Sequence, residues 1–130
     1  MSWNSYSLDQ TAQRLVLSAK TRDPQSLNQA HKMRMSTAYG LERFWGEHLR
    51  LQGKEEDKSK YWKETWDALV ETLKKAGITI PNDEVSADNV RSISGMSERL
   101  WKVPVEDQRV ALAVLTQLCD CIVWWTQRYK

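Results

Sequence analysis

The sequence is poor in the residues that break helices. Its 130 residues include only five glycines and three prolines, too few for the many tight turns of an all-β sandwich. The scarcity of turn residues favours long helices instead. The sequence therefore predicts an all-α protein and, at this length, a single helical domain covering residues 1–130.

Histidine and cysteine are also scarce, with two of each. There is no HExxH motif and no Cys/His cluster with metal-ligand spacing, so we expect no metal site. The phosphate-holding loops GxxxxGK[ST] and GxGxxG are missing, and no nucleophile elbow marks a hydrolase. Cys119 and Cys121 are two positions apart in an apolar run, where helical side chains diverge and do not share a disulfide or a metal. We expect no cofactor.

Two further absences concern location. The sequence shows neither a signal peptide nor an apolar run of membrane-spanning length. Together with the small number of cysteines, these absences predict a cytoplasmic protein with no membrane partner.

Tryptophan, by contrast, is abundant, with seven Trp against a single Phe. Each such ring can bury about 150–250 Å², so a chain of this length can build a substantial core. Four of the tryptophans lie at positions compatible with a helical core: Trp62, Trp66, Trp101 and Trp124. Three fall outside the predicted apolar stripes: Trp3, Trp45 and Trp125. Because exposed tryptophans anchor interfaces, we predict that Trp45 and Trp125 contact a protein partner.

Apolar spacing and capping signals predict a compact bundle of about five helices. The expected ranges are 8–21, 24–51, 60–76, 86–102 and 104–129. Asp23-Pro24 marks the start of the second helix, as an N-cap followed by proline in the first helical position, and Gly77 ends the third.

The second and the last of these helices stand out. The second is predicted to be one long helix, although Gly40 and Gly46 each weaken it by about 1 kcal/mol relative to alanine; both glycines could also allow close packing or a kink. The last helix is apolar on nearly every side, which is typical of the buried centre of a bundle or of a helix covered by a partner.

Positive charge is concentrated in the first part of the chain. Residues 1–54 carry eight Lys/Arg and four Asp/Glu, whereas residues 55–106 carry eight and eleven, although the whole chain has a net charge of only +2. A local positive surface can bind a phosphate backbone without reading its sequence. We predict RNA binding through six basic residues: Lys20, Arg22, Lys32, Arg34, Arg43 and Arg50. The alternative interpretation is a solvated helical face.

Arg43 and His48 support a second, catalytic interpretation. Their R-x4-H spacing resembles that of HEPN-type ribonucleases, in which the pair acts on the 2′-hydroxyl and the scissile phosphate of RNA. Histidine supplies acid–base chemistry near neutral pH, and arginine holds the phosphate. Such a short spacing also arises by chance, and Phe44 stands where the family usually has a polar residue. A packed, hydrogen-bonded His48 is the alternative.

The order of features along the chain resembles a known family. A short first helix precedes a long basic helix, a charged gap, a helix centred on Tyr-Trp, and an apolar last helix. The segments that carry the likeness are Tyr39-Gly40-Leu41, Phe44-Trp45, Tyr61-Trp62 and Arg109-Val110-Ala111-Leu112-Ala113 before Trp124. Together they are similar to the small, all-helical, Cmr-type subunit of type III CRISPR effector complexes, although Gln108-Arg109 stands where that family often has Tyr-Arg.

The resemblance implies a non-enzymatic, five-helix RNA-binding subunit of an antiviral ribonucleoprotein. Its copies would associate head-to-tail along a guide–target duplex or a single-stranded target, beside the other subunits of the effector complex. A heterologous repeat of this kind needs exposed apolar anchors, the role predicted above for Trp45 and Trp125. Two alternatives stay open, the HEPN-like ribonuclease and a helical adaptor that binds only protein.

Overall fold

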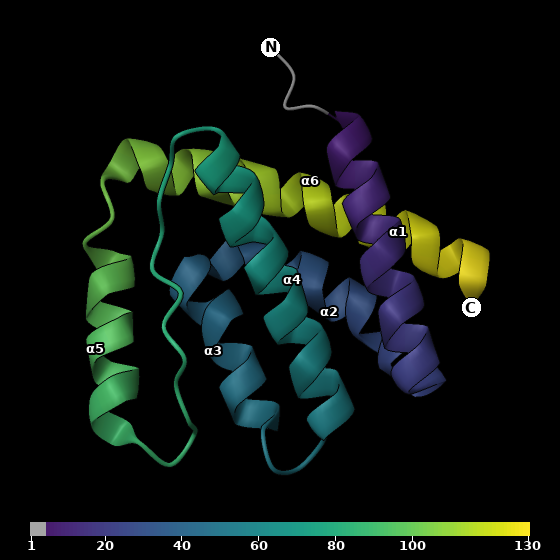
Figure 1. Cartoon of the computed structure of the whole chain (residues 1–130), viewed down its shortest axis with the longest axis horizontal. Coiled ribbons are helices and arrows are strands. Elements are labelled where there is room, and N and C mark those ends of the chain that lie inside the picture. The colour runs from purple at the N-terminus through teal and green to yellow at the C-terminus, as the bar shows by residue number, and fades with distance from the viewer. Residues whose placement is uncertain (1–4) are drawn as a thin grey trace.

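The computed structural model describes residues 5–130, and this part of the chain is all-helical (Figure 1). It contains six α-helices and two short 3₁₀ segments, with no strand in the same range. Their bounds are α1 Ser5–Arg22, η1 Pro24–Gln29, α2 Ala30–Ser36, η2 Thr37–Tyr39, α3 Leu41–Leu51, α4 Glu56–Lys75, α5 Val90–Trp101 and α6 Val105–Tyr129. The all-α prediction is confirmed, whereas Trp3 lies outside the described residues.

The predicted long second helix over 24–51 is wrong, because the chain turns within it. Its start is confirmed: the Asp23 carboxylate accepts the Gln25 N–H at 3.1 Å, with Pro24 in the first position. The segment then divides into η1, α2, η2 and α3. Gly40, at φ +97° and ψ 176°, separates η2 from α3 in a backbone conformation open almost only to glycine. Gly40 is therefore a corner rather than a weak helical position.

α6 is the central helix of the bundle. It runs along the long dimension of the molecule, and α1, α2 and α4 pack against it (Figure 1). Its buried residues are Ala111, Val114, Leu115, Leu118, Cys119, Ile122 and Thr126. The prediction of a buried C-terminal helix holds for this face, while Trp124 on the same helix is exposed.

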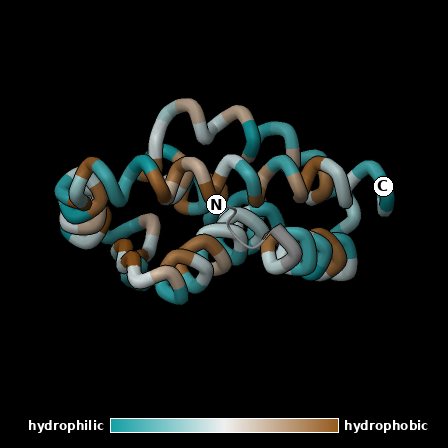
Figure 2. Tube along the Cα trace, turned by 90° about the horizontal axis from the view of Figure 1, so that it is seen from above, coloured by the Kyte–Doolittle hydropathy of each residue, from teal (hydrophilic) through white to brown (hydrophobic). Residues whose placement is uncertain are grey.

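The length and composition of α6 have a second consequence. By these two criteria alone the helix is long and apolar enough to cross a membrane, a test that the core helix of a soluble protein also passes. Hydrophobic and hydrophilic residues are interspersed along the Cα trace (Figure 2). The cytoplasmic location stays a prediction.

The aromatic core lies between α3 and α4. The Phe44 ring lies 4.9 Å from the ring of Trp62 and 6.5 Å from that of Trp66, measured between centroids. Such pairs contribute about 0.5–1.5 kcal/mol each beyond the area they bury. The indole N–H of Trp62 donates to the side-chain oxygen of Gln29 at 3.0 Å. The predicted core positions of Trp62 and Trp66 are confirmed.

α5 lies at the edge of the bundle, against α3, after an irregular segment that begins at Gly77 (Figure 1). The N-cap of α5 is Asn89, whose side-chain oxygen accepts the Ser92 N–H at 3.1 Å. The helix therefore starts later than the predicted residue 86. The inward face of α5 presents Met96, Ser97 and Leu100. Trp101, at the end of the helix, is 66% exposed, so its predicted core position is wrong.

Candidate nucleic-acid interface

The six predicted phosphate-binding residues do not form one patch, because some of them hold helices together. Arg22 of α1 forms an ion pair with Glu64 of α4 at 2.6 Å. Arg34 of α2 pairs with Asp120 of α6, also at 2.6 Å. Both contacts join elements that are distant in sequence, so we assign these two arginines to the fold.

Lys20 is likewise engaged at the far end of the bundle. Its ammonium donates to the carbonyl oxygen of Tyr129 at 2.7 Å, where the last turn of α6 lies beside α1. The phenol of Tyr129 also accepts from the Gln13 amide, at 2.9 Å. These bonds fasten the C-terminal end of α6 to α1 and separate Lys20 from the basic residues of α2 and α3.

The remaining three basic residues lie on α2 and α3. Lys32 and Arg43 line a common hollow of about 320 Å³. Arg50 is seven positions after Arg43 in α3, which places it on the same helical face about 10 Å away along the axis. Its guanidinium binds the Glu47 carboxylate, with Nε to Oε1 at 2.9 Å, and this hydrogen bond raises the pKa of Arg50.

A second hollow, of about 290 Å³, adjoins the first, and Tyr39 and Arg43 line both. Its other wall comes from the end of α5 and the start of α6, with Trp101 and Gln108. We refer to the two hollows and their rim as the Tyr39 surface, defined by Lys32, Met35, Tyr39, Arg43, Trp101 and Gln108.

The Tyr39 surface presents aromatic rings to solvent beside positive charge. Tyr39 is 69% exposed, similar to Trp101, and the corner at Gly40 ends the helical path directly after it. The Arg43 guanidinium carbon lies 5.7 Å from the centre of the Tyr39 ring, within the range of a cation–π contact. Exposed rings next to cations are what sequence-tolerant binding of single-stranded nucleic acids requires.

Sequence reasoning missed Tyr39, Met35 and Trp101 as site residues. Tyr39 and Met35 lie on a segment taken for one continuous helix, and Trp101 was assigned to the core. The sequence offers one signal, the aromatic Tyr39 immediately before Gly40; the positive φ of that glycine is seen only in the structure.

Arg43 and His48 are not brought together. Five positions apart on α3, their side chains diverge by about 140° around the helix axis. His48 is buried, its Nδ1 lies 2.5 Å from the Trp45 carbonyl oxygen, and its ring meets the Trp45 ring edge-on at 5.6 Å. Burial lowers the pKa of His48. The geometry matches the packed, hydrogen-bonded histidine of the alternative interpretation.

Of the two predicted protein-interface tryptophans, Trp45 needs correction, whereas the role of Trp125 stays a prediction. Trp45 has no exposed area, because it lies one turn after Leu41 and next to Phe44 on the broad buried face of α3, so its prediction as an anchor is wrong. Trp125 is partly covered by α1, and its indole N–H donates to Asp9 at 3.0 Å. Its neighbour Trp124 is the exposed ring of the pair, at 55%.

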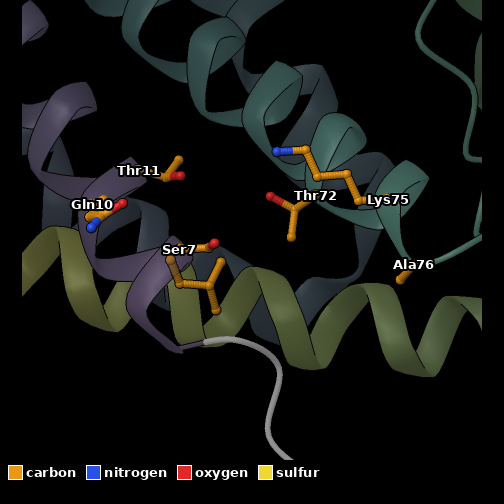
Figure 3. A pocket seen from close by; sticks show the side chains of 7 residues that line it. Ser7, Gln10, Thr11, Thr72, Lys75 and Ala76 are labelled. Atoms are coloured by element: carbon orange, nitrogen blue, oxygen red, sulfur yellow. The ribbon is translucent and has the colours of Figure 1, made fainter.

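A further hollow, of about 350 Å³, lies between α1 and α4, with Ser7 and Thr11 across from Thr72 and Lys75 (Figure 3). The Thr72 hydroxyl already donates to the Ala68 carbonyl at 2.8 Å. The lining residues include one lysine and no carboxylate, histidine or cysteine. This hollow therefore lacks the acid–base pair that a catalytic site needs.

The described residues also offer no metal site or activated thiol. Residues 5–130 contain no group of three His, Cys, Asp or Glu placed to hold a metal ion. Burial raises the pKa of both Cys119 and Cys121, which keeps these thiols protonated and poorly nucleophilic.

Comparisons with known proteins do not assign this chain: no family model, no curated protein and no solved structure matches it. The functional interpretation therefore depends on the residues and geometry of the Tyr39 surface.

Proposed function

We propose that this chain is a non-catalytic RNA-binding subunit that holds single-stranded RNA on the Tyr39 surface. The observation that carries the proposal is the meeting of two exposed rings, Tyr39 and Trp101, with two cations, Lys32 and Arg43. Within the described part of the chain, neither Lys32 nor Arg43 forms an ion pair. Both charges are therefore available to phosphates.

The chemistry of the surface favours a single strand over a duplex. Stacking of a base on an aromatic side chain contributes about 1–3 kcal/mol per base, and only an unpaired strand can turn its bases toward Tyr39 and Trp101. Arg43 and Lys32 neutralise phosphates independently of sequence. Arg50 lies two helical turns after Arg43 on the same face of α3, but its charge is paired with Glu47, so the proposal depends on Lys32 and Arg43.

The sequence resemblance supplies the cellular setting of the proposal. In it, the chain is a cytoplasmic structural subunit of a type III CRISPR-like antiviral ribonucleoprotein, associating with other subunits and head-to-tail with its own copies. Trp124 on the outer face of α6 is exposed and supports such protein contacts, because exposed tryptophans anchor interfaces. The same observation favours the second candidate, a helical adaptor that binds protein alone.

Fluorescence anisotropy with a labelled 15-nucleotide oligo(U) tests RNA binding directly. The variant Lys32→Ala/Arg43→Ala should bind at least about tenfold more weakly than the wild type, since each charged contact contributes about 1.5–3 kcal/mol. The matched control Lys74→Ala/Lys75→Ala removes the same charge from exposed lysines at the end of α4 and should bind within about twofold of the wild type.

Two results would overturn the proposal. One is the absence of RNA binding by the wild type at low salt together with a co-purifying protein partner, which would favour the adaptor. The other is cleavage of labelled RNA in the presence of a metal chelator, lost in Arg43→Ala and in His48→Ala, which would favour the ribonuclease. If the Lys32/Arg43 and Lys74/Lys75 variants weaken binding equally, the RNA binds away from the Tyr39 surface, and that result overturns the proposed site as well.

A further inference from the structure

The hollow between the Gly40 corner and the turn from α5 to α6 differs in chemistry from the rest of the Tyr39 surface. Tyr39 and Trp101 line it with exposed rings, and its volume of about 290 Å³ is enough for a single nucleobase. Arg43 lies at the point where this hollow meets its neighbour. A strand crossing the surface could therefore place one base here and its phosphate on Arg43.

Besides the donors of Arg43, Tyr39 and Trp101, this hollow offers two side chains with hydrogen-bond acceptors. The Gln108 amide nitrogen donates to two backbone carbonyls, that of Trp101 at 3.3 Å and that of Val103 at 2.6 Å. Since both neighbours are acceptors, the amide orientation is fixed, and the side-chain oxygen is the atom that Gln108 can offer to a ligand. Glu42 is the second polar side chain, and one of its oxygens accepts from Ser97 at 2.9 Å.

These acceptors determine what the hollow can take. The Glu42 carboxylate disfavours a phosphate there, because two like charges repel in a partly buried site. A neutral base that presents N–H donors meets no such penalty. Adenine, guanine and cytosine carry exocyclic amino groups, whereas uracil has none, and its one ring N–H on the pairing edge lies between two carbonyl oxygens. Purines also present a larger face to Tyr39 and Trp101.

We propose that this hollow binds one unstacked purine that carries an exocyclic amino group, with Tyr39 and Trp101 stacking on the base and Gln108 or Glu42 accepting from its amine. The proposal rests on the proposed RNA-binding function and adds a base preference to it. Trp101, Gln108 and Glu42 are its specificity-determining residues, while Lys32 and Arg43 supply affinity for any sequence.

The test compares oligo(U) with oligonucleotides that differ at one central position. A single adenosine or guanosine should raise the affinity at least about fivefold through stacking. Purine riboside keeps the ring system of adenosine but lacks the amine. An oligonucleotide with purine riboside at the central position should bind at least about threefold more weakly than the one with adenosine, as expected for one lost hydrogen bond.

Protein variants then locate the effect. Trp101→Ala should remove the gain from the central purine while leaving oligo(U) binding measurable, and circular dichroism checks its fold. Trp124→Ala, which truncates another exposed tryptophan, should keep the full gain.

The outcomes distinguish the purine site from the RNA-binding function on which it rests. If oligo(U) binds through Lys32 and Arg43 but a central purine adds nothing, the purine site is refuted and the RNA-binding function stands. Equal affinity for adenosine and purine riboside would refute the role of the acceptors. If no RNA binds at all, both proposals fall.

Discussion

Two glycines in one segment provide a sharp test of the fold, because the structure gives them opposite roles. Gly40 has φ +97° and ψ 176°, where an L-residue costs about 1–3 kcal/mol. A Cβ added there meets no atom within 4 Å, so the whole penalty comes from the backbone. Gly40→Ala should therefore lower the free energy of unfolding by about 1–3 kcal/mol.

Gly46 lies inside α3, and alanine should have the opposite effect there. Its added Cβ would lie 3.7 Å from a Glu42 carboxylate oxygen, an ordinary van der Waals contact. Replacing a helical glycine with alanine stabilises a protein by about 0.4–1 kcal/mol. We therefore expect Gly46→Ala to raise the free energy of unfolding, which separates the two variants by about 1.5–4 kcal/mol.

Urea denaturation followed by circular dichroism measures both values. The dependence of the unfolding free energy on urea should be the same in both variants, as expected when only stability changes. A continuous helix over 24–51 predicts that both Gly40→Ala and Gly46→Ala are stabilising. Stabilisation by Gly40→Ala would therefore refute the corner, and with it the placement of Tyr39.

Two further predictions concern buried side chains. Trp45→Ala should lower the free energy of unfolding by about 3–5 kcal/mol, as for other fully buried aromatic residues. Truncation of the exposed Trp124 to alanine should lower it by less than about 1 kcal/mol. Equal costs in thermal denaturation would contradict the assignment of Trp45 to the core. Burial holds the pKa of His48 below its ordinary value of 6.5. As the pH decreases, this histidine is therefore protonated in the unfolded chain before it is protonated in the folded protein. Its contribution to stability is full above about pH 7 and falls as the pH decreases through 6.5. His48→Asn should flatten the profile of unfolding free energy between pH 7 and pH 5, and an unchanged slope would contradict a buried neutral histidine.

The helix boundaries that depend on local chemistry could be predicted from the sequence. Asp23-Pro24 starts η1, Gly77 follows the end of α4 at φ +84°, and Pro104 directly precedes α6. Proline fixes φ at the start of a helix, and glycine permits the left-handed backbone after its end, so no distant contact is needed to predict these boundaries.

The break at Gly40 could not be predicted in the same way. A glycine inside an amphipathic pattern is compatible with a weakened helix, a kink or a corner, and the choice depends on how the flanking segments pack. The buried face of α3 is also broader than one narrow stripe, since Trp45 and Leu49 are buried beside Phe44 and His48. This is why Trp45, outside the predicted stripe, is in the core.

The candidate site depends even more on tertiary structure. Lys32 and Arg43 were predicted to bind RNA from their charge, but nothing in the sequence indicates that Trp101 lies beside them, more than fifty residues later in the chain. Charge also failed to distinguish Arg43 from Arg34, which forms an ion pair with Asp120, because the partner comes from α6. The composition showed that cations were present, and the fold determines which of them are available.

The dependence of RNA affinity on salt tests the central claim most directly. Each phosphate contact on a single strand contributes about 0.7 to the slope of log affinity against log salt concentration. For labelled oligo(U), we predict that Arg43→Ala lowers the affinity and reduces this slope by about 0.7, the contribution of one phosphate contact. The exposed Lys74→Ala variant should change neither. An Arg43→Ala variant with the affinity and slope of the wild type would contradict RNA binding on the Tyr39 surface.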